Sequence, residues 1–160
     1  MPVSPNEFRS ALSRFASGIT VVTTKDDSGK FYGITVSAFC SVSLEPPLVL
    51  ICIEKLSGSH SALLESSRFT VNILAAGDEG LSEHFASILD EKFEGIAYEV
   101  DDHGLPFLPS SIARLECSVF RTLDGGDHSV FLGLVEGVSV HDAETDPLLY
   151  FQGGYREIAK

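Results

Sequence analysis

The chain has 160 residues, 44% of them apolar, and its 11 lysines and arginines against 23 aspartates and glutamates give a formal net charge of −12 at pH 7. This charge repels phosphate backbones and anionic lipid, which disfavours functions at nucleic acids or membrane surfaces. The length suffices for one sizeable core and leaves little room for a second, so we predict a single domain over residues 1–160.

The first predicted element is a short amphipathic helix. Ser4 and Glu7 have the spacing of a capping box, and Pro5 stands at the first helical position. Apolar side chains then recur at helical spacing until Gly18 stops the helix. They are Phe8, Ala11, Leu12 and Phe15.

Three extended segments are predicted to follow as a β-meander. Residues 19–24 form the first, and a turn at 26–29 leads into the second. The third, 48–53, is unbroken in its apolar character, which predicts burial on both faces.

The second extended segment is the most informative part of the chain. In the sequence GITVSAFCSVSLEPPLV at 33–49, an extended conformation places several hydroxyl side chains on one face and apolar side chains on the other. The hydroxyl residues are Thr35, Ser37, Ser41 and Ser43. Such a face suits a flat polar ligand lying against a barrel wall. An ordinary half-exposed strand rich in serine and threonine is the alternative.

The middle of the chain mixes helices with a strand. Residues 61–66 read as a short helix, 69–74 as a strand, and 79–89 as a second helix. The apolar side of this second helix contains Leu81, Phe85, Ile88 and Leu89. Residues 90–109 are irregular, with a possible short strand near Tyr98. Acidic residues gather between Asp78 and Asp102 and again at Asp142, Glu144 and Asp146.

Two long β-rich segments, 112–123 and 129–141, flank Asp124-Gly125-Gly126-Asp127, which is a strong hairpin signal. Long antiparallel strands with inserted helices fit a closed or split barrel, a fold that also removes exposed sheet edges. We therefore predict a β-rich fold with inserted short helices, mainly β or α+β.

The cysteines indicate a reducing environment. Cys40, Cys52 and Cys117 are odd in number, far apart and inside strand-like segments, so we expect reduced, buried thiols and no disulfide framework. The five histidines show no metal-ligand spacing. Because no basic segment precedes a long apolar one and no 18 apolar residues are consecutive, we expect neither a signal peptide nor a membrane span, and a cytoplasmic location.

The loop at 55–61, KLSGSHS, has the composition of an anion site. It opens a helix, whose free amides, together with small hydroxyls, a cation and a glycine, suit a phosphate group. Simple capping of the helix by Ser59 or Ser61 is the alternative. The loop matches neither a Walker A motif nor a dinucleotide-binding fingerprint.

Five stretches in order resemble the flavin reductase-like family, the split-barrel FMN-binding proteins that serve as small components of two-component flavin monooxygenases. They are 14–18 (RFASG), 33–49, 66–72 (SSRFTVN), 126–128 (GDH) and 150–156 (YFQGGYR). The resemblance covers nearly the whole chain and implies a split β-barrel of the FMN-binding type.

The resemblance also implies where the flavin binds. Ser57 and Ser59 would contact the FMN phosphate, with Lys55 and His60 as weaker candidates. Backbone and hydroxyl groups on the 33–49 segment would meet the edge of the flavin ring or its ribityl chain. These are the groups of Thr35, Ser37 and Ala38.

Further contacts follow from the same resemblance. Cys52 would end a strand under the flavin ring, although plain core packing is the alternative. His84 and Phe85 belong to a segment that closes over the flavin, and Phe85 is expected to be a core residue rather than a ligand. His128 would contact the nicotinamide nucleotide. Tyr155 and Arg156 would add an aromatic wall and a charge to that pocket, although a docked C-terminal tail is the alternative.

The implied function is hydride transfer from NADH or NADPH to FMN or FAD. This chemistry belongs to the cofactors, so no catalytic acid or base is assigned. The resemblance further implies a homodimer that supplies reduced flavin to a separate oxygenase. Two alternatives remain: another enzyme of this fold, such as a pyridoxamine-phosphate oxidase-like or deazaflavin-dependent reductase, and a flavin-binding or redox-sensing module without turnover.

Overall fold

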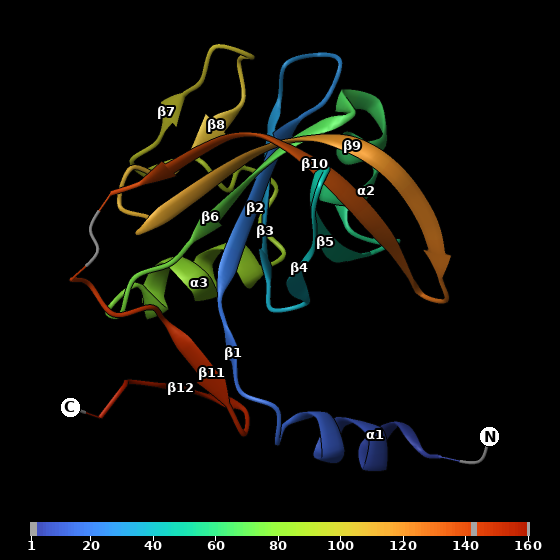
Figure 1. Cartoon of the computed structure of the whole chain (residues 1–160), viewed down its shortest axis with the longest axis vertical. Helices are drawn as coiled ribbons and strands as arrows, with labels where there is room; N and C mark the ends of the chain where they lie inside the picture. Colours follow the sequence, from blue (N-terminus) through green and yellow to red (C-terminus); the bar gives the residue numbers. More distant parts are fainter. Residues whose placement is uncertain (1–2, 142–143, 160) are drawn as a thin grey trace.

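The structure, a computed structural model, describes residues 3–141 and 144–159. Asp142, part of the second acidic group, lies outside the described residues. The N-terminal helix α1 (Pro5–Leu12) begins with the expected capping box, in which the Ser4 hydroxyl accepts from the Glu7 amide. It ends at Leu12 rather than reaching Gly18, and none of its residues is buried. In Figure 1, α1 projects from the rest of the chain.

A seven-stranded antiparallel sheet in the order β3-β2-β6-β9-β10-β5-β4 forms the centre of the molecule. Its strands are β2 (Thr20–Lys25), β3 (Phe31–Val36), β4 (Phe39–Leu44), β5 (Pro47–Glu54), β6 (Arg68–Ile73), β9 (Ala113–Gly125) and β10 (His128–Val140). The expectation of a β-rich fold with few, short helices is confirmed.

The expected β-meander was wrong. Strands β2 and β3 pair, and so do β4 and β5, but β3 and β4 stand at opposite edges of the sheet. Only Ser37 and Ala38 join them, and two residues span roughly 7 Å at most, so the sheet curls until its two edges meet. The Cys52 amide donates to the Ala38 carbonyl at this junction, 3.1 Å away.

The single hydroxyl-bearing strand expected at 33–44 is therefore two strands with a bend between them. A bulge between Ser41 and Ser43 further interrupts the alternation in β4. The apolar side of β4 is also not packed, because Val42 is 47% and Leu44 96% exposed. Strand β5 alternates between buried and partly exposed residues, so its two-sided burial was wrong as well.

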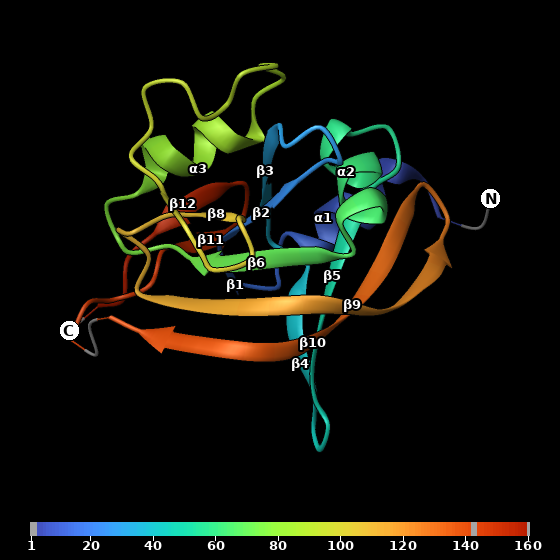
Figure 2. The same ribbon diagram turned by 90° about the horizontal axis from the view of Figure 1, so that it is seen from above.

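The long hairpin of β9 and β10 is confirmed. The two strands pair along their whole length, and Gly126 and Asp127 form the turn, with Gly126 at a φ of +83° that favours glycine. Two register shifts interrupt the pairing. Figure 2 shows this curved ribbon on the side of the molecule opposite α3 (Glu79–Ala86), while α2 (Gly58–Ser66) lies nearer its turn end.

Helix α3 ends earlier than expected. Ser87 is extended, and its hydroxyl donates to the His84 carbonyl, which satisfies one of the last acceptors of the helix. Ile88 and Leu89 therefore do not continue the apolar side of the helix. Ile88 is fully exposed and Leu89 is 54% exposed.

Short strands complete the fold. Strands β7 (Glu99–Val100) and β8 (Pro106–Phe107) form a small ribbon in the irregular segment. At the C-terminal end, β11 (Leu149–Phe151) pairs with both β1 (Ser17–Gly18) and β12 (Gly154–Arg156), as Figure 1 shows. Within the described residues, no helix is long and apolar enough to cross a bilayer.

Two hydrophobic clusters form the core. The larger one lies inside the curled sheet and includes Ile51, Phe69 and Phe131, all fully buried. The smaller one packs α3 against β2 through Val21 and Phe85. Cys117 lies in the larger cluster, where burial raises the pKa of its thiol to about 12. The expectation of buried thiols fails for the other cysteines, because Cys40 is exposed and Cys52 is partly exposed.

Candidate functional site

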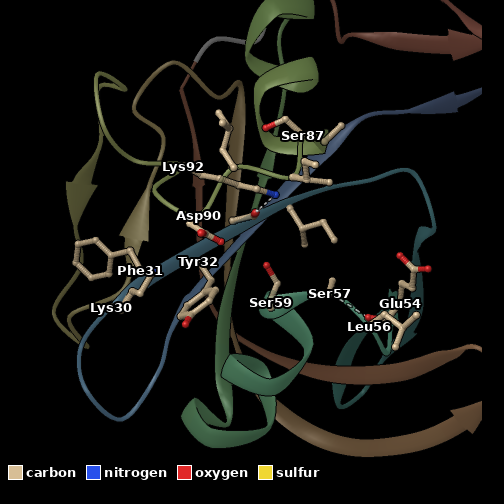
Figure 3. Close-up of a pocket in the computed structure, with 16 residues that line it drawn as sticks. Lys30, Phe31, Tyr32, Glu54, Leu56, Ser57, Ser59, Ser87, Asp90 and Lys92 are labelled. Carbon is tan, nitrogen blue, oxygen red and sulfur yellow. Dashed lines mark hydrogen bonds between the residues drawn. The ribbon is translucent and has the colours of Figure 1, made fainter.

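A cleft of about 490 Å³ lies between β3, the start of α2 and the segment that follows α3. Figure 3 shows these three walls facing one another. The residues that line the cleft are Lys30, Phe31, Tyr32, Gly33, Ile34, Glu54, Leu56, Ser57, Gly58, Ser59, Ala86, Ser87, Ile88, Leu89, Asp90 and Lys92. The volume is that of an ordinary small-molecule site.

The first turn of α2 presents hydroxyl and backbone amide groups to the cleft. Ser59 is buried and its hydroxyl makes no hydrogen bond within the described chain, while Figure 3 shows the side chain pointing into the cleft. Ser57, the N-cap residue, differs because its hydroxyl donates to the Glu54 carbonyl at 2.9 Å. Amide groups in a first helical turn have no helical acceptor, so this surface offers donors to an anion.

Lys92 fixes the opposite wall. Its Nζ donates to the carbonyls of Gly33 on β3, at 3.1 Å, and Phe85 at the end of α3, at 2.8 Å. Its own carbonyl accepts a hydrogen bond from Nε2 of His84, at 2.7 Å. Burial lowers the pKa of the Lys92 ammonium. These contacts hold the segment 87–92 against β3.

Close packing between β3 and α3 also depends on Gly33. A Cβ atom at this position would lie 2.6 Å from Cδ1 of the buried Phe85 ring, and only glycine avoids that overlap.

A cation and an aromatic ring stand at the end of the cleft near the β2–β3 turn. Lys30 Nζ lies 2.8 Å from a Glu91 carboxylate oxygen and 5.7 Å from the centre of the Tyr32 ring. The hydrogen bond to Glu91 raises the pKa of Lys30. The Tyr32 hydroxyl donates to Asp26 at 3.2 Å, and burial is the main reason that its pKa is raised.

The other two residues expected near the phosphate point elsewhere. Lys55 is bound to the carboxylate of Asp124 and donates to the Gly126 carbonyl at 2.6 Å, so it ties the loop to the β9–β10 turn. His60 shares a hydrogen bond of 2.9 Å with Ser129 and packs edge-on against Phe131. Neither lines the cleft.

The four residues expected at the flavin ring also lie outside the cleft lining. The Thr35 hydroxyl donates to the Ser82 carbonyl of α3 at 2.6 Å. Ser37 and Ala38 are exposed in the link between β3 and β4. Cys52 shares a face of β5 with Glu54, which does line the cleft, and burial is the main reason that the pKa of its thiol is raised.

Two aromatic candidates are mainly structural. Phe85 is fully buried in the smaller core cluster, as expected for a core residue. Tyr155 packs against that cluster and donates through its hydroxyl to the Ser82 hydroxyl at 3.0 Å. His84 packs edge-on against Phe85 and supports the wall through Lys92.

His128 starts β10, directly after the hairpin turn, and its backbone faces Glu54 of β5. Its Nδ1 lies 2.7 Å from the Asp127 carboxylate, and this contact is the main reason that the pKa of Asp127 is lowered. The side chain is 43% exposed. His128 thus lies one strand away from a residue of the cleft wall.

Sequence reasoning missed Lys30, Tyr32 and Lys92. No local motif marks them, since Lys92 acts through a contact with Gly33, 59 residues away in the chain. The exposed apolar residues of the cleft were also missed, because Ile88 and Leu89 were assigned to the packed face of a helix. The available signal was Ser87, which stands before this apolar pair. A serine side chain competes with the helix backbone for hydrogen bonds and can end a helix early.

Comparison with known proteins gives consistent matches over almost the whole chain. The family model described as "Flavin reductase like domain" matches residues 12–159. The reductase subunit HsaB of a flavin-dependent monooxygenase from Mycobacterium tuberculosis is 41% identical over 157 residues, which are 98% of this chain and 83% of that protein. FMN reductase (NADH) SmoA from Agrobacterium fabrum is 37% identical over 153 residues, 96% of this chain and 86% of that protein.

Among solved structures, the NADH:FAD oxidoreductase SgcE6 from Streptomyces globisporus C-1027, in complex with NAD and FAD fragments, is similar with a TM-score of 0.93. It is 34% identical in sequence, and the match covers 99% of this chain and 95% of that one.

Proposed function

Because the chain belongs to the flavin reductase-like family and is a nicotinamide-dependent flavin reductase, we propose that the cleft between β3, α2 and residues 86–92 binds the flavin. The observation that carries this proposal is Ser59, a residue only 6% exposed whose hydroxyl opens into the cleft and makes no hydrogen bond within the described chain. It lies in the first turn of α2, where free amide groups favour a phosphate.

The remaining lining fits the other parts of a flavin nucleotide. Three apolar side chains are exposed at the cleft, where a flat ring would cover them: Leu56, Ile88 and Leu89. Gly33 lets α3 pack closely behind the cleft through Phe85. Ser57 and Ser59 are the proposed phosphate ligands, and Lys55 and His60 are not, because each is engaged elsewhere.

When FMN or FAD is bound, it accepts a hydride from NADH, and this chemistry is supplied by the two cofactors. The chain's own residues bind the phosphate, orient the ring and exclude water from it. We assign the nicotinamide contact to His128, which stands on the strand next to Glu54 of the cleft wall. The alternative hydride donor is NADPH, and the assay described next distinguishes the two nucleotides.

The test is steady-state oxidation of NADH and of NADPH by the purified protein, with FMN, FAD or riboflavin added. We expect turnover with NADH and a flavin nucleotide. Tight flavin binding without turnover would support a binding or redox-sensing module instead. An absorbance spectrum without a flavin after reconstitution would point to another cofactor, such as a deazaflavin or pyridoxal phosphate.

The proposal also covers the domain, the oligomeric state, the partner and the cellular location of the protein. We infer one flavin reductase domain over residues 1–160, a split β-barrel and a homodimer, supported by the meeting edges of the sheet and by the exposed apolar side chains of α1 and β4. The name of the HsaB relative supports delivery of reduced flavin to a separate oxygenase. Three cysteines without disulfide bonds support a cytoplasmic location.

A further inference from the structure

A second recess, of about 400 Å³, adjoins the flavin cleft. We call it the aromatic recess, and its lining residues are Lys30, Phe31, Glu91, Phe93, Glu94 and Tyr98. Two of them, Lys30 and Phe31, also line the cleft, so the two hollows are neighbours. Figure 3 shows the Phe31 side chain pointing away from Ser57 and Ser59.

Three aromatic rings form the wall of the recess. Phe31, Phe93 and Tyr98 contact one another edge to face, with centroid distances of 5.3 to 5.7 Å. Phe93 also packs at 5.3 Å against the fully buried Phe85, which anchors the group to the core. Tyr98 remains 40% exposed. The result is a firmly held aromatic surface that is open to solvent, where a flat ring can stack.

The charges around the recess favour a base over a free phosphate. Glu91 and Glu94 line it and repel an anion, but a carboxylate accepts hydrogen bonds from an exocyclic amine. Lys30 stands where the recess meets the cleft and is 2.8 Å from Glu91. A ligand whose phosphate links the two hollows would therefore place that phosphate beside a cation. Its base would lie in the aromatic site, where carboxylates accept hydrogen bonds from an amine.

We propose that the aromatic recess binds the adenine ring of an adenosine diphosphate group, with Tyr98 as the stacking residue and Lys30 beside the phosphates. The expected source is FAD, whose flavin half occupies the adjoining cleft, so the enzyme prefers FAD to FMN. This inference rests on the proposed flavin site. It also addresses a point on which the relatives differ, since one is named for FMN and another for FAD.

The experiment measures dissociation constants of FAD, FMN and ADP for the wild type, Tyr98→Ala and Tyr98→Leu, by equilibrium titration without nicotinamide nucleotide. Base stacking on an aromatic side chain predicts that wild-type protein binds FAD about tenfold more tightly than FMN, and that both variants lose most of this difference. The affinity for FMN should change less than twofold. Phe120→Ala, which removes a 53% exposed aromatic residue from β9 outside both hollows, is the matched control.

NADH also carries an adenosine diphosphate group, so a second arm measures its KM with riboflavin as acceptor. A rise of about tenfold in this KM in Tyr98→Leu, with FAD affinity unchanged, would assign the recess to the adenine of NADH and still support the subsite. Equal wild-type affinities for FMN and FAD, together with an unchanged KM, would overturn it. Equal losses of FMN and FAD affinity in the variants would also overturn it, because Tyr98 would then only support the cleft. If wild type binds no flavin at all, the proposed function itself fails, which is a separate outcome.

Discussion

At the scale of single residues, hydrogen-bond accounting distinguishes two serines that look equivalent in the sequence. Both stand at the start of α2 and line the cleft, yet the Ser57 hydroxyl is used by the Glu54 carbonyl and the Ser59 hydroxyl is not used. A hydroxyl that opens into the cleft and has no partner in the chain is free to bind a ligand, whereas a hydroxyl already in use must first give up a hydrogen bond. The two residues should therefore contribute unequally to flavin binding.

Replacing Ser59 by alanine should weaken FMN binding by roughly 1 to 3 kcal/mol, since hydrogen bonds to charged groups contribute on that order. Ser57→Ala should cost less, because its hydroxyl proton already has an acceptor. Fluorescence quenching of FMN measures both. Ser61→Ala, at an exposed position of the same helix, is the control. Unaltered FMN affinity in the Ser57→Ala/Ser59→Ala double variant would place the phosphate elsewhere.

His128→Ala tests the assignment of the nicotinamide contact. The apparent KM for NADH should rise roughly 2- to 10-fold, as expected for loss of one hydrogen bond, while flavin affinity stays near that of wild type. The same assay compares the turnover numbers of variant and wild type, because misorientation of the reacting rings lowers this number. Loss of flavin affinity with unchanged NADH kinetics would show that the two half-sites were assigned the wrong way round.

At the scale of elements, the cleft depends on a segment that has no regular structure. Residues 87–92 contribute five of its lining residues, yet they follow the end of α3 and form neither helix nor strand. Their position is fixed by Lys92, which contacts β3 and α3 at once. The hydrogen bonds of the Lys92 side chain therefore hold this segment in place, as backbone pairing would hold a strand.

Lys92→Met should weaken flavin binding several-fold, because methionine fills the space but leaves the Gly33 and Phe85 carbonyls without their donor. Limited proteolysis within 87–92 should become faster. Lys25→Met is a matched control, since Lys25 also donates to a backbone carbonyl, that of His103 at 2.9 Å, but lies outside the cleft. Equal flavin affinities in the two variants would contradict the anchoring role.

The pH dependence of stability gives an independent readout for Lys92. Because burial lowers its pKa from the usual 10.5, the unfolded chain binds more protons than the folded one between the lowered pKa and 10.5. Stability from this group therefore rises with pH across that alkaline window. The difference in unfolding free energy between wild type and Lys92→Met should increase with pH there, as measured by urea denaturation.

At the scale of the whole molecule, several apolar side chains lack cover. On α1 and just after it, Phe8, Leu12 and Phe15 are 56 to 79% exposed, and Leu44 on β4 is 96% exposed. Figure 1 shows that α1 projects away from the seven-stranded sheet, where its own chain cannot cover its apolar side. A protein with net charge −12 gains solubility from that charge, but contiguous apolar surface still favours association.

We expect the protein to sediment as a homodimer of twice the 17.2 kDa chain mass at micromolar concentration. Phe8→Ser combined with Leu12→Ser should shift the equilibrium towards the monomer, because both side chains lose apolar area that the interface would bury. Ile158→Ser, which changes a 45% exposed residue at the other end of the chain, serves as control. A fully active wild-type monomer would contradict the dimer.

The sequence by itself determined the local structure wherever a short pattern is sufficient. The capping box of α1, the turn at Gly126 and the long β9–β10 hairpin all form where they were predicted, because their hydrogen bonds join residues close in the chain. The composition of the serine-rich loop before α2 predicts an anion site, and that stays a prediction. The family resemblance then supplied the flavin and the nicotinamide nucleotide.

Only the tertiary structure decided which residues meet at the cleft. Alternation over 33–44 treated Thr35 and Ser41 as neighbours on one strand, but the bend at Ser37 sends the chain to the opposite edge of the sheet. The contacts of Lys55 with Gly126, of Lys92 with Gly33 and of Thr35 with Ser82 join residues 47 to 71 positions apart, so no local pattern could identify them. Periodicity reports which side chains share a face, whereas the closing of the sheet determines what that face meets, and that closing depends on pairing between distant strands.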